Sequence, residues 1–178
     1  MATNKQLAIT EKQLDHDIEK AFKESPAFAR WFLDRTKFRG RNGVDRHSRS
    51  DNPWSRQRHT VDDETTGEPK EVIRDSETDI LVIFEDVDDH THFAIHVENK
   101  LGHGHFTWMQ PEFYHQRAQH WAGNPKFLGY TDYTVVLIAP REFHNRCQSE
   151  CAKFDMYVPH EEIAEFIPSF RPPMAAIT

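Results

Sequence analysis

The sequence predicts an α/β domain in which helices flank a mixed central β-sheet. Two runs of consecutive apolar, mostly β-branched residues, 80–84 and 133–139, are typical of strands that are buried on both faces. Apolar residues recur at helical spacing over 14–22, and residues 112–121, between the two buried runs, predict a further helix. Helices and strands therefore alternate along the chain, which is the order that an α/β fold has.

Two helices are expected at the beginning of the chain. Thr10 is a suitable N-cap, with Gln13 at the capping-box position. The helical pattern is interrupted at Ser25-Pro26, and a second stripe follows that ends before Gly40. The apolar positions of the two stripes are Leu14, Ile18, Ala21 and Phe22, then Phe28, Trp31 and Phe32.

Residues 40–70 combine Gly, Pro, Asn, Ser and charged residues without apolar periodicity, and they predict a long irregular loop. A short strand at 72–73 and the buried strand 80–84 come next. A polar turn then leads to a third strand, 93–97, with period 2. Residues 159–167 predict a short amphipathic helix near the end of the sequence.

The 178 residues are expected to form one domain over 1–178, because domains average roughly 150 residues. No apolar run approaches the roughly 20 residues that a membrane helix needs, and residues 1–19 lack the apolar core of a signal peptide. Two cysteines are too few for a disulfide scaffold. We therefore expect a cytoplasmic protein with no membrane partner.

The charge is distributed unevenly. A net charge of −7 argues against a protein that coats nucleic acid by bulk electrostatics. Between residues 35 and 58, however, eight cations face two anions, whereas residues 61–89 hold twelve carboxylates and two cations. The basic stretch is either a solvated loop or a surface that holds phosphates. Its candidate nucleic-acid-binding residues are Arg39, Arg41, Arg46, Arg49, Arg56 and Arg58.

Acidic residues and a lysine come at the ends of two predicted strands. Asp79 precedes the strand 80–84, while Glu98 and Lys100 follow the strand 93–97. Glu98 and Lys100 share a face with His96, because side chains two apart in a strand point the same way. The connection between the strands is short enough for an antiparallel hairpin, which would bring Asp79 beside Glu98.

This combination suits phosphate chemistry. Carboxylate oxygens hold Mg²⁺, and a lysine one strand step away can orient water or stabilise a developing anion. An isolated Glu-x-Lys is more often an ion pair at a sheet edge. The histidines near the motif have no cysteine partner in the spacing that a structural zinc site prefers.

The sequence Thr78-Asp79, followed by Glu98-Asn99-Lys100, resembles the motif of the PD-(D/E)XK nuclease superfamily, with Thr78 in place of the usual proline. The similarity extends over roughly residues 10–168 and includes Ser25-Pro26-Ala27-Phe28 and the run 134–140. It implies a restriction-endonuclease-like core and a metal-dependent (endo)nuclease that hydrolyses phosphodiester bonds, with DNA as the expected substrate.

The resemblance also implies a role for individual residues. Asp79 and Glu98 would hold Mg²⁺ or Mn²⁺, with the Asn99 carbonyl oxygen as a third donor, and Lys100 would be the catalytic lysine. Gln116 would be an accessory residue near the phosphate or the lysine. A first-helix glutamate would complete the metal shell, and both Glu11 and Glu19 are candidates for it.

Two other functions remain open from the sequence. One is a nucleic-acid-binding module on the same fold that does not cleave. The other is a scaffold protein with residues 61–89 as an acidic docking surface. Cleavage of both strands of a duplex requires two sites, so a homodimer is expected if the protein cuts duplexes.

Overall fold

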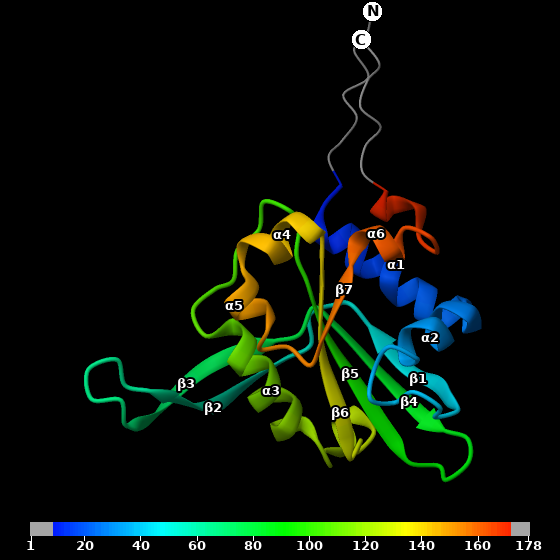
Figure 1. Cartoon of the computed structure of the whole chain (residues 1–178). Helices are drawn as coiled ribbons and strands as arrows, with labels where there is room; N and C mark the ends of the chain where they lie inside the picture. The colour runs from blue at the N-terminus through cyan, green and yellow to red at the C-terminus, as the bar shows by residue number, and fades with distance from the viewer. Residues whose placement is uncertain (1–8, 172–178) are drawn as a thin grey trace, which may run out of the picture.

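The computed structural model describes residues 9–171 and contains a five-stranded central sheet (Figure 1). Its spatial order is β1 (Gly43–Arg49), β4 (Ile80–Asp86), β5 (His92–Asn99), β6 (Asp132–Ala139) and β7 (Met156–Pro159). β1, β4 and β5 pair antiparallel, whereas β5, β6 and β7 pair parallel. The predicted α/β fold with a mixed central sheet is confirmed.

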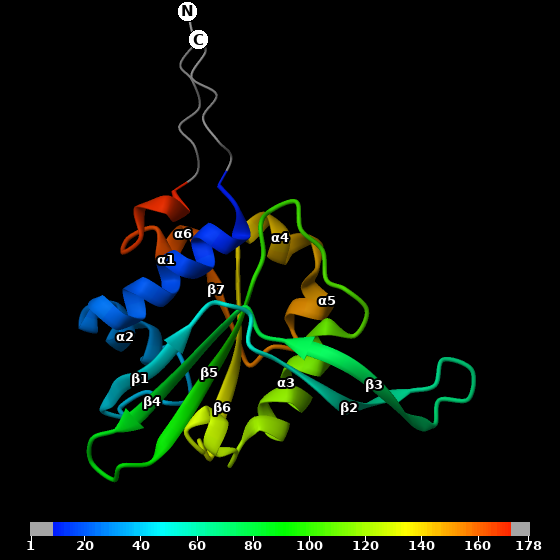
Figure 2. The ribbon, with the colours of Figure 1, turned by 180° about the vertical axis from the view of Figure 1, so that it is seen from behind.

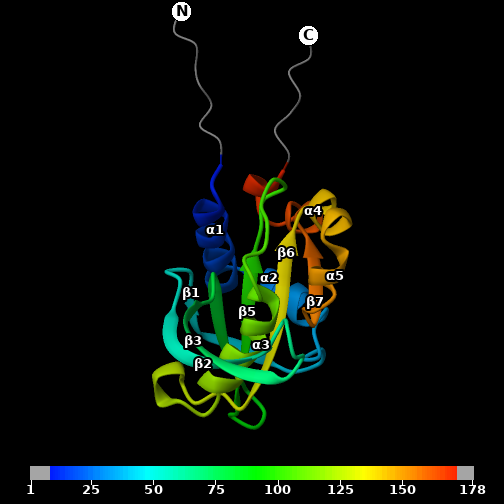
Figure 3. The same ribbon diagram turned by 90° about the vertical axis from the view of Figure 1, so that its left-hand side faces the viewer.

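Helices cover both faces of this sheet (Figures 1 and 3). One layer contains α1 (Glu11–Glu24), α2 (Pro26–Leu33) and α6 (His160–Ile163); the other contains α3 (Gln110–Trp121), α4 (Arg141–Arg146) and α5 (Gln148–Cys151). Alternate residues of β4 point to opposite faces of the sheet and belong to different hydrophobic cores. Val82 packs with α1 and α2, whereas Leu81 and Ile83 pack with Trp121 of α3. Both faces of β4 are therefore buried, as its continuous apolar run predicts.

The first two helices begin and end as predicted. The Thr10 hydroxyl accepts a hydrogen bond from the Gln13 amide at 3.2 Å and caps α1. Ser25 ends α1, and its hydroxyl accepts from the Phe28 amide at 3.2 Å to cap α2. Pro26 occupies the start of α2, where its missing N–H has no helical partner in any case.

The predicted irregular loop over 40–70 is wrong. This segment contains β1 and β2 (Trp54–Asp62), and β2 forms a two-stranded hairpin with β3 (Pro69–Glu77) that reaches away from the central sheet (Figure 2). β2 does alternate: Gln57, His59 and Val61 are buried, and their neighbours are exposed. Two of these three buried side chains are polar, so the segment shows no apolar periodicity.

The end of the chain also differs from the prediction. The helix expected over 159–167 is only α6, four residues long, and the 3₁₀ turn Pro168–Phe170 follows it. β7, α4 and α5 were not predicted, because each has at most six residues and is too short to show periodicity. Within residues 9–171, no helix is long and apolar enough to cross a membrane.

Candidate active site

The start of β4 and the end of β5 lie side by side. Ile80 pairs with Val97 in the antiparallel register, so the next position along places Asp79 opposite Glu98. The Asn99 amide donates a hydrogen bond to Asp79 Oδ2 at 2.9 Å, and Asn52 Nδ2 approaches Oδ1 at 3.3 Å. The hairpin predicted from the short connection between the two strands is confirmed.

Glu98 and Lys100 are in direct contact. Lys100 Nζ lies 2.5 Å from Glu98 Oε1, and the two side chains are 11% and 1% exposed. Gln110, at the start of α3, donates to the same carboxylate oxygen at 2.8 Å. Glu98 Oε2 is buried and has no hydrogen-bond partner among residues 9–171. The carboxylate is thus held through one oxygen, and the other is left free for a ligand.

The first helix brings two more carboxylates to this edge. Glu11 Oε1 accepts a hydrogen bond from the Leu101 amide at 3.0 Å, and Asp15 Oδ1 accepts from Asn99 Nδ2 at 2.8 Å. Glu19 is directed elsewhere: it accepts from the Ser50 amide at 3.0 Å and pairs with Lys23. Of the two first-helix candidates, the contacts place Glu11 beside the motif.

Asp15 was not predicted as a site residue. It stands four residues after Glu11, so the two carboxylates share one helix face. It is also 3% exposed, in a helix whose other buried residues are apolar. Its position next to Leu14, at the edge of the apolar stripe, could have indicated from the sequence that Asp15 is buried.

Crowding of buried carboxylates sets the electrostatics of the site. Burial, then the Glu98 and Asp15 carboxylates, raise the pKa of Asp79 well above its ordinary value. Burial raises the pKa of Asp15 to about 7, and Glu98 and Glu11 act in the same direction. Burial alone would lower the pKa of Lys100, but Glu98, Asp79 and Glu11 outweigh it and raise that pKa. The lysine is therefore a cation among carboxylates, not a free amine.

The carboxylate oxygens at this edge are the type of ligand that Mg²⁺ prefers, together with water. The buried, unpartnered Glu98 Oε2 and the neighbouring Asp79 are the two residues that could hold it. In the part of the chain that the structure describes, no group of three or more His, Cys, Asp or Glu side chains is arranged to hold a metal ion. The site therefore offers a pair of carboxylates, to which main-chain oxygen and water would have to be added.

Gln116 contacts the hairpin and not the motif. Its side-chain amide accepts from the Thr60 amide at 2.8 Å and donates to the Thr60 carbonyl at 2.7 Å. It thereby joins α3 to β2. His96 is fully buried behind the motif, with Nδ1 3.1 Å from the Thr78 hydroxyl and Nε2 3.0 Å from the Tyr130 hydroxyl.

The basic residues of the segment 39–58 are spread over β1, the turn before it and β2, and most of them face carboxylates. The ion pairs are Arg41–Asp86 (2.7 Å), Arg46–Glu85 (2.7 Å), Arg49–Asp51 (2.6 Å), Arg56–Asp75 (3.2 Å) and Arg58–Glu71 (3.3 Å). Arg39 is exposed and forms no ion pair within residues 9–171. Acidic partners from 71–89 thus neutralise much of the charge that the sequence concentrates here.

Sequence reasoning also missed Tyr114 and Arg117 of α3. The Tyr114 hydroxyl accepts from the Asp79 amide and donates to the Val97 carbonyl, at 3.2 Å each. Arg117 is 1% exposed and donates to the Thr78 hydroxyl at 2.8 and 3.0 Å. Their helical spacing could have indicated burial, because both lie on the face of the helix that carries Phe113 and Ala118 into the core.

Comparison with known proteins gives no match: no family model matches this chain, and no curated protein and no solved structure is significantly similar to it.

Proposed function

We propose that this protein is a magnesium-dependent nuclease of the PD-(D/E)XK type, with a restriction-endonuclease-like core and DNA as its substrate. The observation that carries the proposal is the pairing of Asp79 with the Glu98-Asn99-Lys100 strand end across the β4–β5 hairpin. The buried, unpartnered Glu98 Oε2 and the surplus of carboxylates around Lys100 support it. An edge built only as a structural ion pair has no need of the additional acidic residues from α1.

Each residue then has a chemical role. Asp79 and Glu98 would hold Mg²⁺ or Mn²⁺, with the Asn99 carbonyl and water as further oxygen donors. A bound Mg²⁺ lowers the pKa of a coordinated water and neutralises charge on a phosphodiester. Lys100 stays protonated beside these carboxylates, so its ammonium group stabilises the negative charge that develops on the scissile phosphate.

Cleavage of supercoiled plasmid and of single-stranded DNA, at low salt with Mg²⁺ or Mn²⁺ against EDTA, tests the proposal. We expect Asp79→Asn and Lys100→Met to lower the metal-dependent rate by about 10²-fold or more, the scale seen when one transition-state donor is lost. Lys126→Met is the matched control, because Lys126 is exposed in the 3₁₀ turn Pro125–Phe127, which precedes β6. Thermal melting of each variant excludes misfolding. Cleavage that survives both substitutions would reject this centre.

A nucleic-acid-binding module without hydrolysis is the second candidate. The direct Lys100–Glu98 contact favours it, because the lysine already occupies one of the two oxygens that a metal would use. This candidate predicts salt-sensitive retention of DNA with no metal-dependent cleavage. Absence of both binding and cleavage would favour a scaffold protein that docks through residues 61–89. Homodimer formation in solution would be required for cleavage of both strands.

A further inference from the structure

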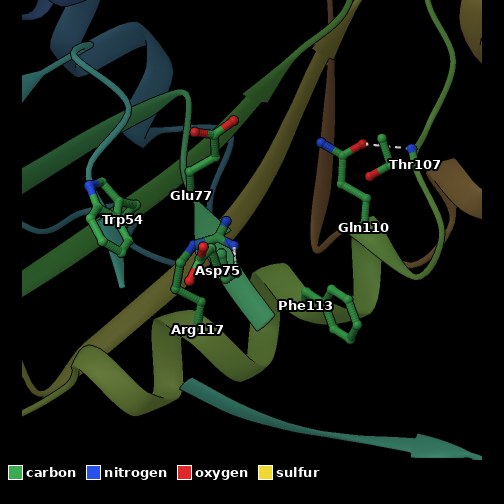
Figure 4. Close-up of a pocket in the computed structure, with 8 residues that line it drawn as sticks. Trp54, Asp75, Glu77, Thr107, Gln110, Phe113 and Arg117 are labelled. Atoms are coloured by element: carbon green, nitrogen blue, oxygen red, sulfur yellow. Dashed lines mark hydrogen bonds between the residues drawn. The ribbon is translucent and has the colours of Figure 1, made fainter. Parts of the chain in front are cut away.

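A cavity of about 560 Å³ opens beside the carboxylate site, between the β2–β3 hairpin and α3 (Figure 4). Its volume falls in the range of roughly 300–1,000 Å³ that small-molecule sites have. Gln110 belongs to both places, because it lines the cavity and donates to Glu98. A group bound in the cavity is therefore next to whatever occupies the carboxylate site.

One wall of the cavity is an exposed aromatic ring. Trp54 begins β2 and is 59% exposed, and Figure 4 shows it across the cavity from Gln110 and Phe113. An indole of this size left uncovered offers a flat π-face to a ligand. The floor is preformed, because Arg117 is held in place by hydrogen bonds to Ser76 and Thr78.

Two of the three charged side chains that line the cavity accept hydrogen bonds; the third, Arg117, is buried and donates to Ser76 and Thr78. Asp75 and Glu77 both line it, and Asp75 is paired with Arg56 at 3.2 Å. Glu77 lies opposite Trp54 in the hairpin register and forms no ion pair with any residue from 9 to 171. A free carboxylate repels phosphate but accepts from amino and imino groups. The cavity thus selects against a phosphate and for a flat ring with N–H donors on its edge.

We propose that this cavity binds an unpaired nucleobase of the nucleic-acid substrate, stacked on Trp54 with its amino edge toward Glu77. The inference rests on the proposed nuclease function and specifies its substrate. A base inside a duplex is stacked on its neighbours and cannot enter, so the substrate has a single-stranded or extruded nucleotide beside the scissile phosphate. Bases with an amino group are preferred to thymine, whose single imino donor is flanked by two carbonyl oxygens that a carboxylate repels.

Fluorescence anisotropy of short labelled DNA strands in EDTA measures this binding without cleavage. We expect Trp54→Ala to weaken binding of a single strand by about tenfold, within the range for loss of one base–aromatic stack, and Trp54→Phe by much less. An abasic strand of equal length, with all its phosphates retained, should bind wild type weakly and be insensitive to Trp54→Ala. Glu77→Gln should reduce the preference of cytosine-rich over thymine-rich strands. Ile73→Ala, an exposed apolar residue on the same hairpin, is the matched control.

The outcomes separate this inference from the function on which it rests. If wild type binds single strands, and neither Trp54→Ala nor removal of the bases changes the affinity, the base site is overturned and the nuclease proposal stands. Wild type that retains no DNA at low salt and cleaves none overturns both. Equal loss of affinity with Ile73→Ala would mean that the hairpin as a whole, and not the indole face, makes the contact.

Discussion

Arg117 holds the segment that precedes Asp79 in place. Its guanidinium is buried against the Tyr114 ring, 3.9 Å from the ring centre, and it bonds the hydroxyls of Ser76 and Thr78. None of its hydrogen-bond partners within residues 9–171 is a carboxylate. Burial lowers the pKa of Arg117, while Tyr114 and the nearby Glu98, Asp79 and Glu77 act in the opposite direction. A buried cation in this position holds the segment that leads into Asp79 and offsets part of the negative charge at the strand ends.

Arg117→Lys should lower the free energy of unfolding by about 1–3 kcal/mol, because one ammonium group cannot replace the fixed fork of guanidinium donors and leaves a hydroxyl unsatisfied. Urea unfolding followed by circular dichroism measures the change. Arg39→Lys, at an exposed position, should stay within about 0.5 kcal/mol of wild type. Equal stability of the two variants would show that the buried network contributes nothing beyond packing.

The β2–β3 hairpin was not predicted from the sequence, and it forms one wall of the cavity beside the carboxylate site. A two-stranded hairpin is marginally stable by itself, so its position depends on α3. His59 lies against the Phe113 ring, with 4.2 Å between the ring centres, and the Trp121 indole donates to the Ser55 hydroxyl at 2.7 Å. Gln116 adds the two hydrogen bonds to Thr60.

Gln116→Ala should therefore loosen the hairpin without unfolding the central sheet. Two partly exposed hydrogen bonds contribute about 1–3 kcal/mol in total, so amide exchange over 54–62 should accelerate by about tenfold while β4 and β5 stay protected. Gln119→Ala is the control, since Gln119 lies on the exposed side of the same helix. Exchange that accelerates equally in β4 would contradict this local role. Loss of cleavage with unchanged exchange would instead favour the accessory catalytic role expected from the resemblance.

At the scale of the whole molecule, a buried polar chain joins three elements. Asn99 of β5 donates to Asp15 of α1 at 2.8 Å, and its Oδ1 lies 2.9 Å from His160 Nε2 of α6. Burial raises the pKa of Asp15 to about 7 and lowers the pKa of His160 to about 4. Both groups are thus neutral in the folded protein at mildly acidic pH.

Their effects on stability have opposite signs. The contribution of Asp15 is fully present below its unfolded pKa of 3.8 and is lost as pH rises through about 7. The contribution of His160 is present above its unfolded pKa of 6.5 and is lost as pH falls toward about 4. Relative to wild type, Asp15→Asn should lose stability on acidification from pH 7 to pH 4, and His160→Gln should gain it, each by up to about 3 kcal/mol. Urea unfolding across this range measures both; parallel curves would contradict the assignment.

The buried strands, the first two helices and the Asp79–Glu98–Lys100 motif could all be predicted from the sequence. Apolar runs, helix caps and strand alternation are local signals, and a short hairpin connection fixes which strand ends meet. The strands within 40–70 could not be predicted, because the buried positions Gln57 and His59 are polar and leave no apolar pattern; packing of the hairpin against α3 buries them. Only the tertiary structure shows that Asp15 joins the site and that Gln110 connects it to the cavity, since contacts between distant segments depend on packing. The basic segment changed most: its charges are local, but apart from Asp51 the carboxylates paired with its arginines come from β3, β4 and the turn after β4.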